Sequence, residues 1–153
     1  MNIKISRRLV IPLALMGVAL WAGPTLAATQ TFQVQLTGAQ QVPAVQTDGM
    51  GTADLSYNPS SRMLSWTITY SMLSGPVLMA HMHGPAAEGK NAKVAIWLTK
   101  RGSHSAVESP IKGKMKLTAA QAKQFEAGQW YINIHTKAHP GGEIRGQVNP
   151  PGG

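Results

Sequence analysis

The histidines carry the clearest chemical signal in the sequence, because four of the five lie in two short clusters. In the first cluster, Met79, His81 and His83 alternate along a predicted β-strand, so they project from one face, about 6.5–7 Å apart per pair. Two imidazoles at that spacing can bind one metal ion, because metal–nitrogen bonds are about 2 Å long. The second cluster, His135 and His139, falls at a strand end and in the following turn. Pairing of the two segments would bring four imidazoles together.

These residues predict a transition-metal site with His81, His83 and His135 as ligands and His139 as a candidate fourth. Imidazole ligands suit copper or zinc, with nickel behind them. The absence of cysteine and the export predicted below favour Cu(II), and Met79 offers an optional soft ligand for Cu(I). The alternatives are histidines that only hydrogen-bond to backbone carbonyls, or a pocket for an anion or a peptide.

Arg145 and Glu143 share one face of the last predicted strand, where we expect an ion pair. The alternative is that Arg145 guides an anion toward the histidines, which would make it the catalytic residue if the protein is an enzyme.

Other chemistries lack support. The chain has no cysteine for disulfides, thiol nucleophiles or zinc fingers, no G-x-S-x-G or phosphate-loop motif, and only six scattered acidic residues.

The elements that must position these residues are short strands. Only 13% of the 153 residues are charged, and 16 Gly and 10 Pro indicate a turn-rich β protein of one-domain size. One helix is expected over 119–127, where Thr118 and Gln121 form a capping box and Gly128 ends the helix. The fold predicted is an all-β, antiparallel β-sandwich or Greek-key barrel, Ig-like or superoxide-dismutase-like, with one short helix. Alternating apolar and polar residues predict strands over 31–37, 52–57, 63–70, 77–83, 93–99, 130–135 and 143–148.

Residues 1–27 have the pattern of a signal peptide. Basic residues precede an apolar run over 9–22, which is shorter than the about 20 residues that a transmembrane helix needs. Small residues at positions 25 and 27 predict cleavage after Ala27. We therefore expect an exported protein, periplasmic or extracellular, with no stable membrane anchor. Residues 149–153 are expected to form a disordered tail.

The formal net charge is +8 at pH 7, and basic residues concentrate in 90–101 and 112–116. Such a surface could attract an anionic surface polymer or protein. It lacks the interleaved aromatic side chains of a single-strand-binding platform, so no nucleic-acid partner is expected.

Four motifs, in order, resemble those of the CHRD (chordin) domain family. They are F-x-V-x-L-T-G-A-Q-Q-V-P at 32–43, A-H-M-H-G-P-A at 80–86, Y-I-N-I-H-T at 131–136 and P-G-G-E-I-R-G-Q at 140–147. The resemblance implies a CHRD domain over 28–148 with an all-β, sandwich-like fold. The family occurs in chordin, an extracellular antagonist of bone morphogenetic proteins, and in exported bacterial proteins. For the bacterial members the resemblance implies no settled activity, and chordin's growth-factor partner is not carried over.

A looser, fold-level similarity links the chain to copper–zinc superoxide dismutases, which hold copper partly through a His-x-His strand with an arginine near the metal. This chain lacks their disulfide cysteines and a recognisable zinc loop, so the analogy implies a copper-only site at His81, His83 and His135. The residues that match those recurrent in the CHRD family are His81, His83, Gly84, Pro85, Asn133, His135, Pro140, Gly142, Glu143, Arg145 and Gly146.

The sequence thus predicts an exported CHRD-domain protein that binds a transition metal, with copper as the favoured cofactor. A copper-only superoxide-dismutase-like enzyme is one alternative. The other is a non-catalytic extracellular or periplasmic binding or adhesion module whose histidines are structural.

Overall fold

Eight antiparallel strands and one α-helix make up the part of the chain that the computed structural model describes, residues 28–102 and 105–152. In chain order the elements are β1 (Gln30–Thr37), the 3-10 helix η1 (Gly38–Gln40), β2 (Met50–Asn58), β3 (Met63–Ser71), β4 (Val77–His83), β5 (Val94–Trp97), β6 (Ile111–Lys116), α1 (Ala119–Glu126), β7 (Trp130–Thr136) and β8 (Ile144–Val148).

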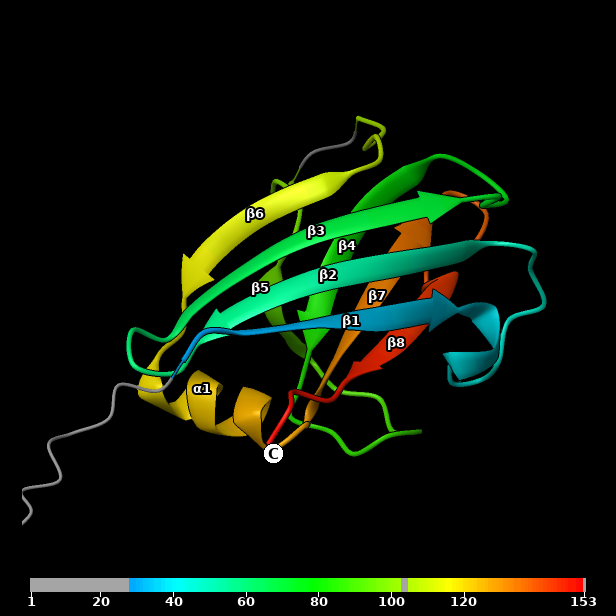
Figure 1. Ribbon diagram of the computed structural model, residues 1–153. Helices are drawn as coiled ribbons and strands as arrows, with labels where there is room; N and C mark the ends of the chain where they lie inside the picture. The colour runs from blue at the N-terminus through cyan, green and yellow to red at the C-terminus, as the bar shows by residue number, and fades with distance from the viewer. Residues whose placement is uncertain (1–27, 103–104, 153) are drawn as a thin grey trace, which may run out of the picture.

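The strands form one sheet in the order β5-β4-β7-β8-β1-β2-β3-β6, which curls over so that its two halves face each other (Figure 1). The half with β1, β2, β3 and β6 lies in front in this view, and the half with β5, β4, β7 and β8 lies behind. Between the halves, β1 and β8 pair at one position, Thr37 opposite Arg145. This curled, half-barrel sheet confirms the predicted all-β sandwich.

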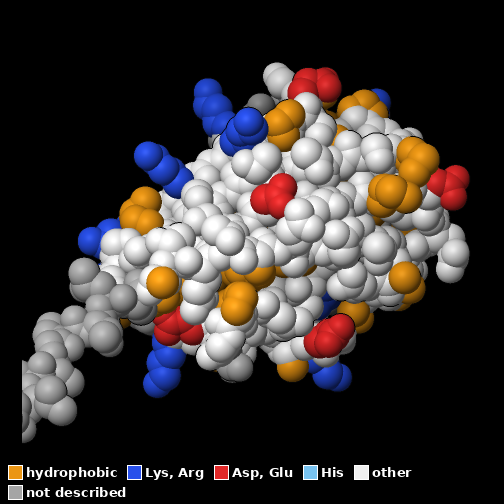
Figure 2. Space-filling view, in the orientation of Figure 1, with side chains coloured by type: hydrophobic (Ala, Val, Ile, Leu, Met, Phe, Trp, Pro, Cys, Tyr) orange, Lys and Arg blue, Asp and Glu red, His pale blue; other side chains and the backbone are white. Residues whose placement is uncertain are grey.

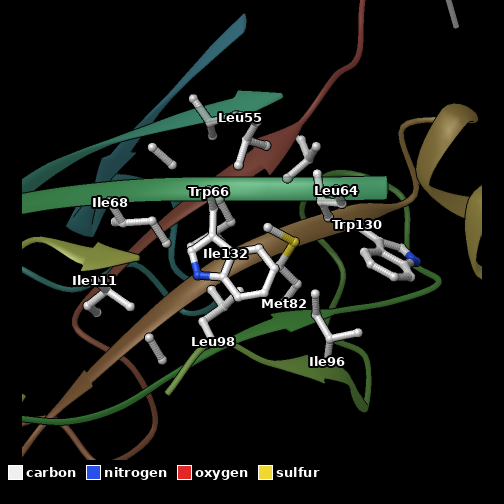
Figure 3. Packing of buried hydrophobic residues seen from close by; sticks show 14 of the residues in the cluster. Leu55, Leu64, Trp66, Ile68, Met82, Ile96, Leu98, Ile111, Trp130 and Ile132 are labelled. Atoms are coloured by element: carbon white, nitrogen blue, oxygen red, sulfur yellow. The ribbon is translucent and has the colours of Figure 1, made fainter. Parts of the chain in front are cut away.

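The core fills the space between the two halves. Apolar side chains of β3, including Leu64, Trp66 and Ile68, point toward Met82 of β4 and Ile132 of β7 (Figure 3). Every second residue of each strand points inward, because successive side chains of a strand alternate between the two faces of the sheet. The alternation predicted from the sequence therefore identified most of the core.

Helix α1 closes one end of the sandwich. Its N-terminus has the predicted capping box, in which the Thr118 hydroxyl accepts from the Gln121 amide and the Gln121 side chain accepts from the Thr118 amide. Beyond its C-terminus, Gly128 adopts a φ of 68°, a left-handed conformation that glycine tolerates best. Inside the helix, Phe125 packs against Tyr57, with ring centroids 4.9 Å apart.

Strand β6 was not predicted, because its lysines at 112, 114 and 116 look like a basic surface stretch and Gly113 has a low strand propensity. In the structure β6 is an edge strand whose three lysines are exposed. Lys and Arg side chains project along this side of the front face (Figure 2). Charged side chains on an edge strand hinder unwanted pairing with another sheet.

The outer face of the back half is unusual, because it is polar and yet buried. On β4, β7 and β8 the residues facing away from the core include His81, Asn133, His135 and Arg145, each at most 7% exposed. Two loops, residues 38–49 and 84–93, lie over this face and hydrogen-bond to it, as detailed below. Polar groups removed from water must find partners in the protein, so this covered face is where a functional site is expected.

Within the described residues, no helix is long and apolar enough to cross a membrane. The predicted signal peptide, residues 1–27, and His104 lie outside the described residues. After β8 the described residues continue to a turn at residues 151–152. Pro150 is buried and Pro151 is exposed.

Gly113 gives a test of the packing between β6 and the core. A Cβ at this position would overlap the indole ring of Trp66, whereas a Cβ at Gly141 would meet nothing within 4 Å. We expect Gly113→Ala to lower the free energy of unfolding by about 1–3 kcal/mol, the usual cost of overpacking. Urea unfolding followed by tryptophan fluorescence measures this change, with Gly141→Ala as the matched control. Equal stability of the two variants would contradict the packing described.

Candidate metal centre

Three imidazoles meet on the covered face of the back half. Strand β4 supplies His81 and His83, and its antiparallel neighbour β7 supplies His135. The register places Asn133 opposite His81 and Met79 opposite His135, so the three histidines are near neighbours across one strand pair. One ligand nitrogen from each histidine lies within 4.8 Å of the other two. The structure thus brings together three of the four histidines predicted as ligands.

Backbone carbonyls determine which nitrogen of two of the rings carries the hydrogen. His83 Nδ1 lies 3.0 Å from the Ala92 carbonyl oxygen, and His135 Nδ1 lies 2.9 Å from the Pro140 carbonyl oxygen. A carbonyl oxygen can only accept a hydrogen bond, so each Nδ1 must be the donor. In the neutral ring each Nε2 then carries the lone pair. This is how proteins orient histidines that bind metals.

His81 completes the group from the other side. Its Nδ1 lies 3.2 Å from His135 Nε2. Two nitrogens bound to one ion at about 2 Å are themselves about 3 Å apart, so this separation suits a shared ion. The Nε2 atoms of His81 and His83 are buried and have no hydrogen-bond partner among the described residues. An unpartnered buried acceptor costs free energy, and an ion at the centre would give the His83 lone pair its partner.

Burial keeps the three rings neutral. It lowers the pKa of His81 to about 4, with a further contribution from the neighbouring His135 and His83. Burial also lowers the pKa values of His83 and His135, although the carbonyls of Ala92 and Pro140 partly offset it. Neutral imidazole is the form that binds metal ions, so at neutral pH binding releases no net proton from these rings.

Aromatic rings surround the histidines. The His83 ring is stacked parallel on Tyr131, with centroids 4.9 Å apart. On the other side of β4, Trp97 of β5 stands opposite His81, and the two rings are nearly perpendicular with centroids 4.2 Å apart. Trp97 is 37% exposed, whereas His81 beside it is 4% exposed. These rings provide an apolar boundary that limits access of water to the imidazoles.

Arg145 lies beside this group, but not in the ion pair that we expected. Its guanidinium carbon is 3.5 Å from the centroid of the Tyr131 ring, and it donates to Asn91 Oδ1 at 3.0 Å and to the Lys90 carbonyl at 2.8 Å. It is a buried cation, 2% exposed, and neither of these acceptors is a carboxylate. Burial lowers its pKa, partly offset by Tyr131 and Glu88.

The predicted Glu143–Arg145 ion pair is wrong because Glu143 precedes β8, so the strand alternation that would place both side chains on one face does not apply. The buried Glu143 carboxylate instead accepts four hydrogen bonds, from the hydroxyls of Thr47, Thr136 and Ser74 and from the Ser74 amide, at 2.6–2.9 Å. These bonds join the loop over 38–49, the loop before β4 and the end of β7. Glu143 therefore fastens the covering loop over 38–49 and the loop before β4 to the end of β7.

Met79 and His139 lie at the margin of the group. Met79 is half-buried and alternates with His81 on β4, which places it on the histidine side of the strand. His139 lies in the turn after β7 and is not one of the three clustered histidines; its carbonyl accepts from the amides of Thr136 and Gly142. Ligand roles for both residues stay predictions.

Several residues of the site could not be assigned a role from the sequence. Gln41 donates to Asn133 Oδ1 at 2.8 Å, and Asn91 joins the two covering loops by donating to the Val42 carbonyl at 2.8 Å. The alternation of Tyr131, Asn133 and His135 indicated their common face. The carbonyls that orient the imidazoles leave no trace in the sequence, because every residue has one.

Fold and site together define a β-sandwich domain with a buried, carbonyl-oriented histidine cluster on the outer face of one half. The chain belongs to the CHRD domain family, whose model matches residues 32–148. The matched segment runs from β1 to the end of β8 and includes the three histidines, Arg145 and Glu143. Searches of curated proteins and of solved structures gave no match. The resemblance found in the four motifs is thereby confirmed.

The buried carboxylate of Glu143 gives a pH-dependent prediction. Burial alone would raise its pKa, but the bonds from Thr136, Thr47 and Ser74 outweigh burial, so the pKa is lowered. A carboxyl group with a lowered pKa in the folded state stabilises the fold above its unfolded pKa, and this stabilisation is lost as the pH falls through the folded value. We expect Glu143→Gln to lower the free energy of unfolding by about 2 kcal/mol at pH 7.

Urea unfolding at a series of pH values measures this effect. The difference between wild type and Glu143→Gln should begin to shrink as the pH falls below the unfolded pKa of about 4.3, where the unfolded chain takes up the proton, and should be lost as the pH falls through the lower folded pKa. Glu108→Gln, a substitution of an exposed glutamate away from the site, is the matched control. A difference that stayed constant down to the acid limit would rule out the ionised carboxylate as its source.

Proposed function

We propose that this protein is exported and binds one transition-metal ion, preferably copper, through His81, His83 and His135. The observation that carries the proposal is the orientation of the rings: carbonyls hold the hydrogens of His83 and His135 on Nδ1, so the lone pair of each ring is on Nε2. The proximity of His81 Nδ1 to His135 Nε2 supports His81 as the third ligand, through Nδ1. The described group contains imidazoles only, with no carboxylate.

Copper is favoured by the chemistry of the donors. Imidazole nitrogens bind copper and zinc well, and among divalent ions of the first row Cu²⁺ binds most tightly to a given set of nitrogen ligands. Export into an oxidising compartment would supply Cu(II). The thioether of Met79, opposite His135 on the neighbouring strand, would suit Cu(I) and is the optional fourth ligand.

A titration with Cu(II) tests the site. The protein should be expressed with residues 1–27, purified after any processing, and freed of bound metal with a chelator. We expect one tightly bound equivalent of Cu(II), and we expect His81→Ala/His83→Ala to abolish it because two of three ligands are lost. His104→Ala, which removes a histidine that belongs to neither cluster, is the matched control. Binding by the double variant that equals wild type would overturn the proposal.

The same preparation tests export. Cleavage after Ala27 gives a protein whose mass corresponds to a chain that starts at Ala28, and cell fractionation should find it outside the cytoplasm. An unprocessed chain in the cytoplasm would contradict export, without bearing on the metal site.

A copper-dependent superoxide-dismutase-like activity is the second candidate, and the burial of Arg145 favours it. A buried guanidinium beside the stacked pair of Tyr131 and His83 provides a positive potential that would attract a small anion. Three protein ligands would leave a coordination position open for that anion. Copper would supply the change of oxidation state that dismutation needs, whereas Arg145 would orient the anion.

Superoxide consumption by the copper-loaded protein measures this activity. If the second candidate holds, we expect loss of activity in His81→Ala/His83→Ala and a reduction of about 10-fold in Arg145→Ala, with copper content unchanged in the latter. Copper binding without superoxide consumption would leave metal binding as the function. A protein that binds no copper would favour a binding or adhesion module, with the exposed lysines of β6 as the surface for an anionic polymer.

A further inference from the structure

Of the two ring nitrogens of His81, only Nδ1 has a hydrogen-bond partner among the described residues. Its Nδ1 points across to β7, where it lies 3.2 Å from His135 Nε2. Its Nε2 is buried without a hydrogen-bond partner among the described residues. Because His135 Nδ1 already donates to the Pro140 carbonyl, His135 Nε2 is an acceptor, and His81 Nδ1 must carry the hydrogen between them.

Binding of an ion through His81 Nδ1 requires the opposite tautomer. A nitrogen that donates its lone pair to a metal cannot keep its hydrogen, so in the neutral ring the hydrogen must be on Nε2. One proton leaves Nδ1 for solvent and one binds at Nε2, and the ring stays neutral. The site therefore needs an acceptor for an N–H at His81 Nε2.

The ring of Trp97 lies where that acceptor is needed. Strand β4 lies between β7 and β5, so a His81 ring whose Nδ1 points toward β7 has its opposite edge, with Nε2, toward β5. Trp97 of β5 is directly opposite His81, with an interplanar angle of 87° and centroids 4.2 Å apart. The two rings are therefore in edge-to-face contact, the arrangement in which an aromatic face can accept an N–H group.

Resting on the proposed function, we propose that Trp97 is a positioning residue whose indole face accepts the Nε2–H of His81 and so holds His81 in the tautomer that binds metal through Nδ1. Trp97 itself does not coordinate the ion. The guanidinium carbon of Arg101 is 5.7 Å from the Trp97 ring centroid, on a ring that is otherwise partly exposed. The same ring also shields His81 from water, which would compete as an acceptor.

The direct test is nitrogen NMR of protein labelled at histidine with ¹⁵N, with Zn²⁺ as a diamagnetic probe. We expect His81 to carry its hydrogen on Nδ1 without metal and on Nε2 with Zn²⁺ bound, and we expect Nδ1 to show the shift of a metal ligand. Loss of a partner that orients a ligand typically weakens metal affinity by 10–100-fold, so Trp97→Leu should weaken Cu(II) and Zn²⁺ binding by about 10-fold or more. Trp97→Phe keeps an aromatic face and should restore most of the affinity.

Val94→Ala, which removes another exposed apolar side chain of β5, is the matched control and should bind metal as wild type does. Urea unfolding of each variant shows whether the fold persists, and the His81 tautomer is read directly in any case. Wild-type affinity and an unchanged tautomer in Trp97→Leu would overturn this inference alone, as would binding of Zn²⁺ through His81 Nε2 in wild type. Absence of metal binding in wild type would overturn the proposed function and this inference with it.

Discussion

The pairing of β4 with β7 is the interaction on which the candidate site depends. It joins segments separated by about fifty residues and places His81 and His83 beside His135 in one register. Because side chains alternate along a strand, a shift of this register by one residue would send the imidazoles of one strand into the core and its isoleucines outward. The core residues Ala80, Met82, Ile132 and Ile134 therefore determine the geometry of the histidines as firmly as any contact between the rings.

A polar face that is covered must satisfy its own hydrogen-bonding groups. Here most of the partners come from the two covering loops. Gln41 donates a hydrogen bond to Asn133, and the Ala92 carbonyl orients His83. Arg145 donates to the Asn91 side chain and to the Lys90 carbonyl. Glu143 fastens the first loop through Thr47 and the segment before β4 through Ser74. On this face the buried side-chain atoms without a partner among the described residues are the Nε2 atoms of His81 and His83 and, farther along β8, Gln147 Oε1. The other polar groups of this face have hydrogen-bond partners, whereas imidazole nitrogens at its centre do not. This is the pattern expected of a binding site.

The strands, the helix and its cap could be predicted from the sequence because each depends on local signals: alternation along β1 or β3, the capping box at Thr118, and Gly128 after α1. Strand β6 could not, since its lysines and Gly113 mask the pattern. The histidine cluster could be predicted because the chain has few histidines, and because two residues that are two positions apart on a strand lie on the same face. The predicted ion pair between Glu143 and Arg145 was wrong because the alternation of a strand was assumed for Glu143, which precedes the first residue of β8. Asn91, on a covering loop, and Trp97, on β5, reach the site only through tertiary contacts that no local sequence pattern contains.

The separation of the ligands along the chain also constrains when the site can exist. The β1–β2–β3 meander joins neighbouring segments and involves short loop closures, whereas β7 must cross to β4 after both β6 and α1 have been synthesised. Contacts between distant segments form late, because a long loop must first be closed. Until then the chain presents only His81 and His83, a pair too incomplete to hold an ion firmly. If the protein is exported unfolded and binds metal as proposed, it would therefore acquire the ion at its destination, and the metal supply of that compartment, rather than of the cytoplasm, would decide which ion it carries.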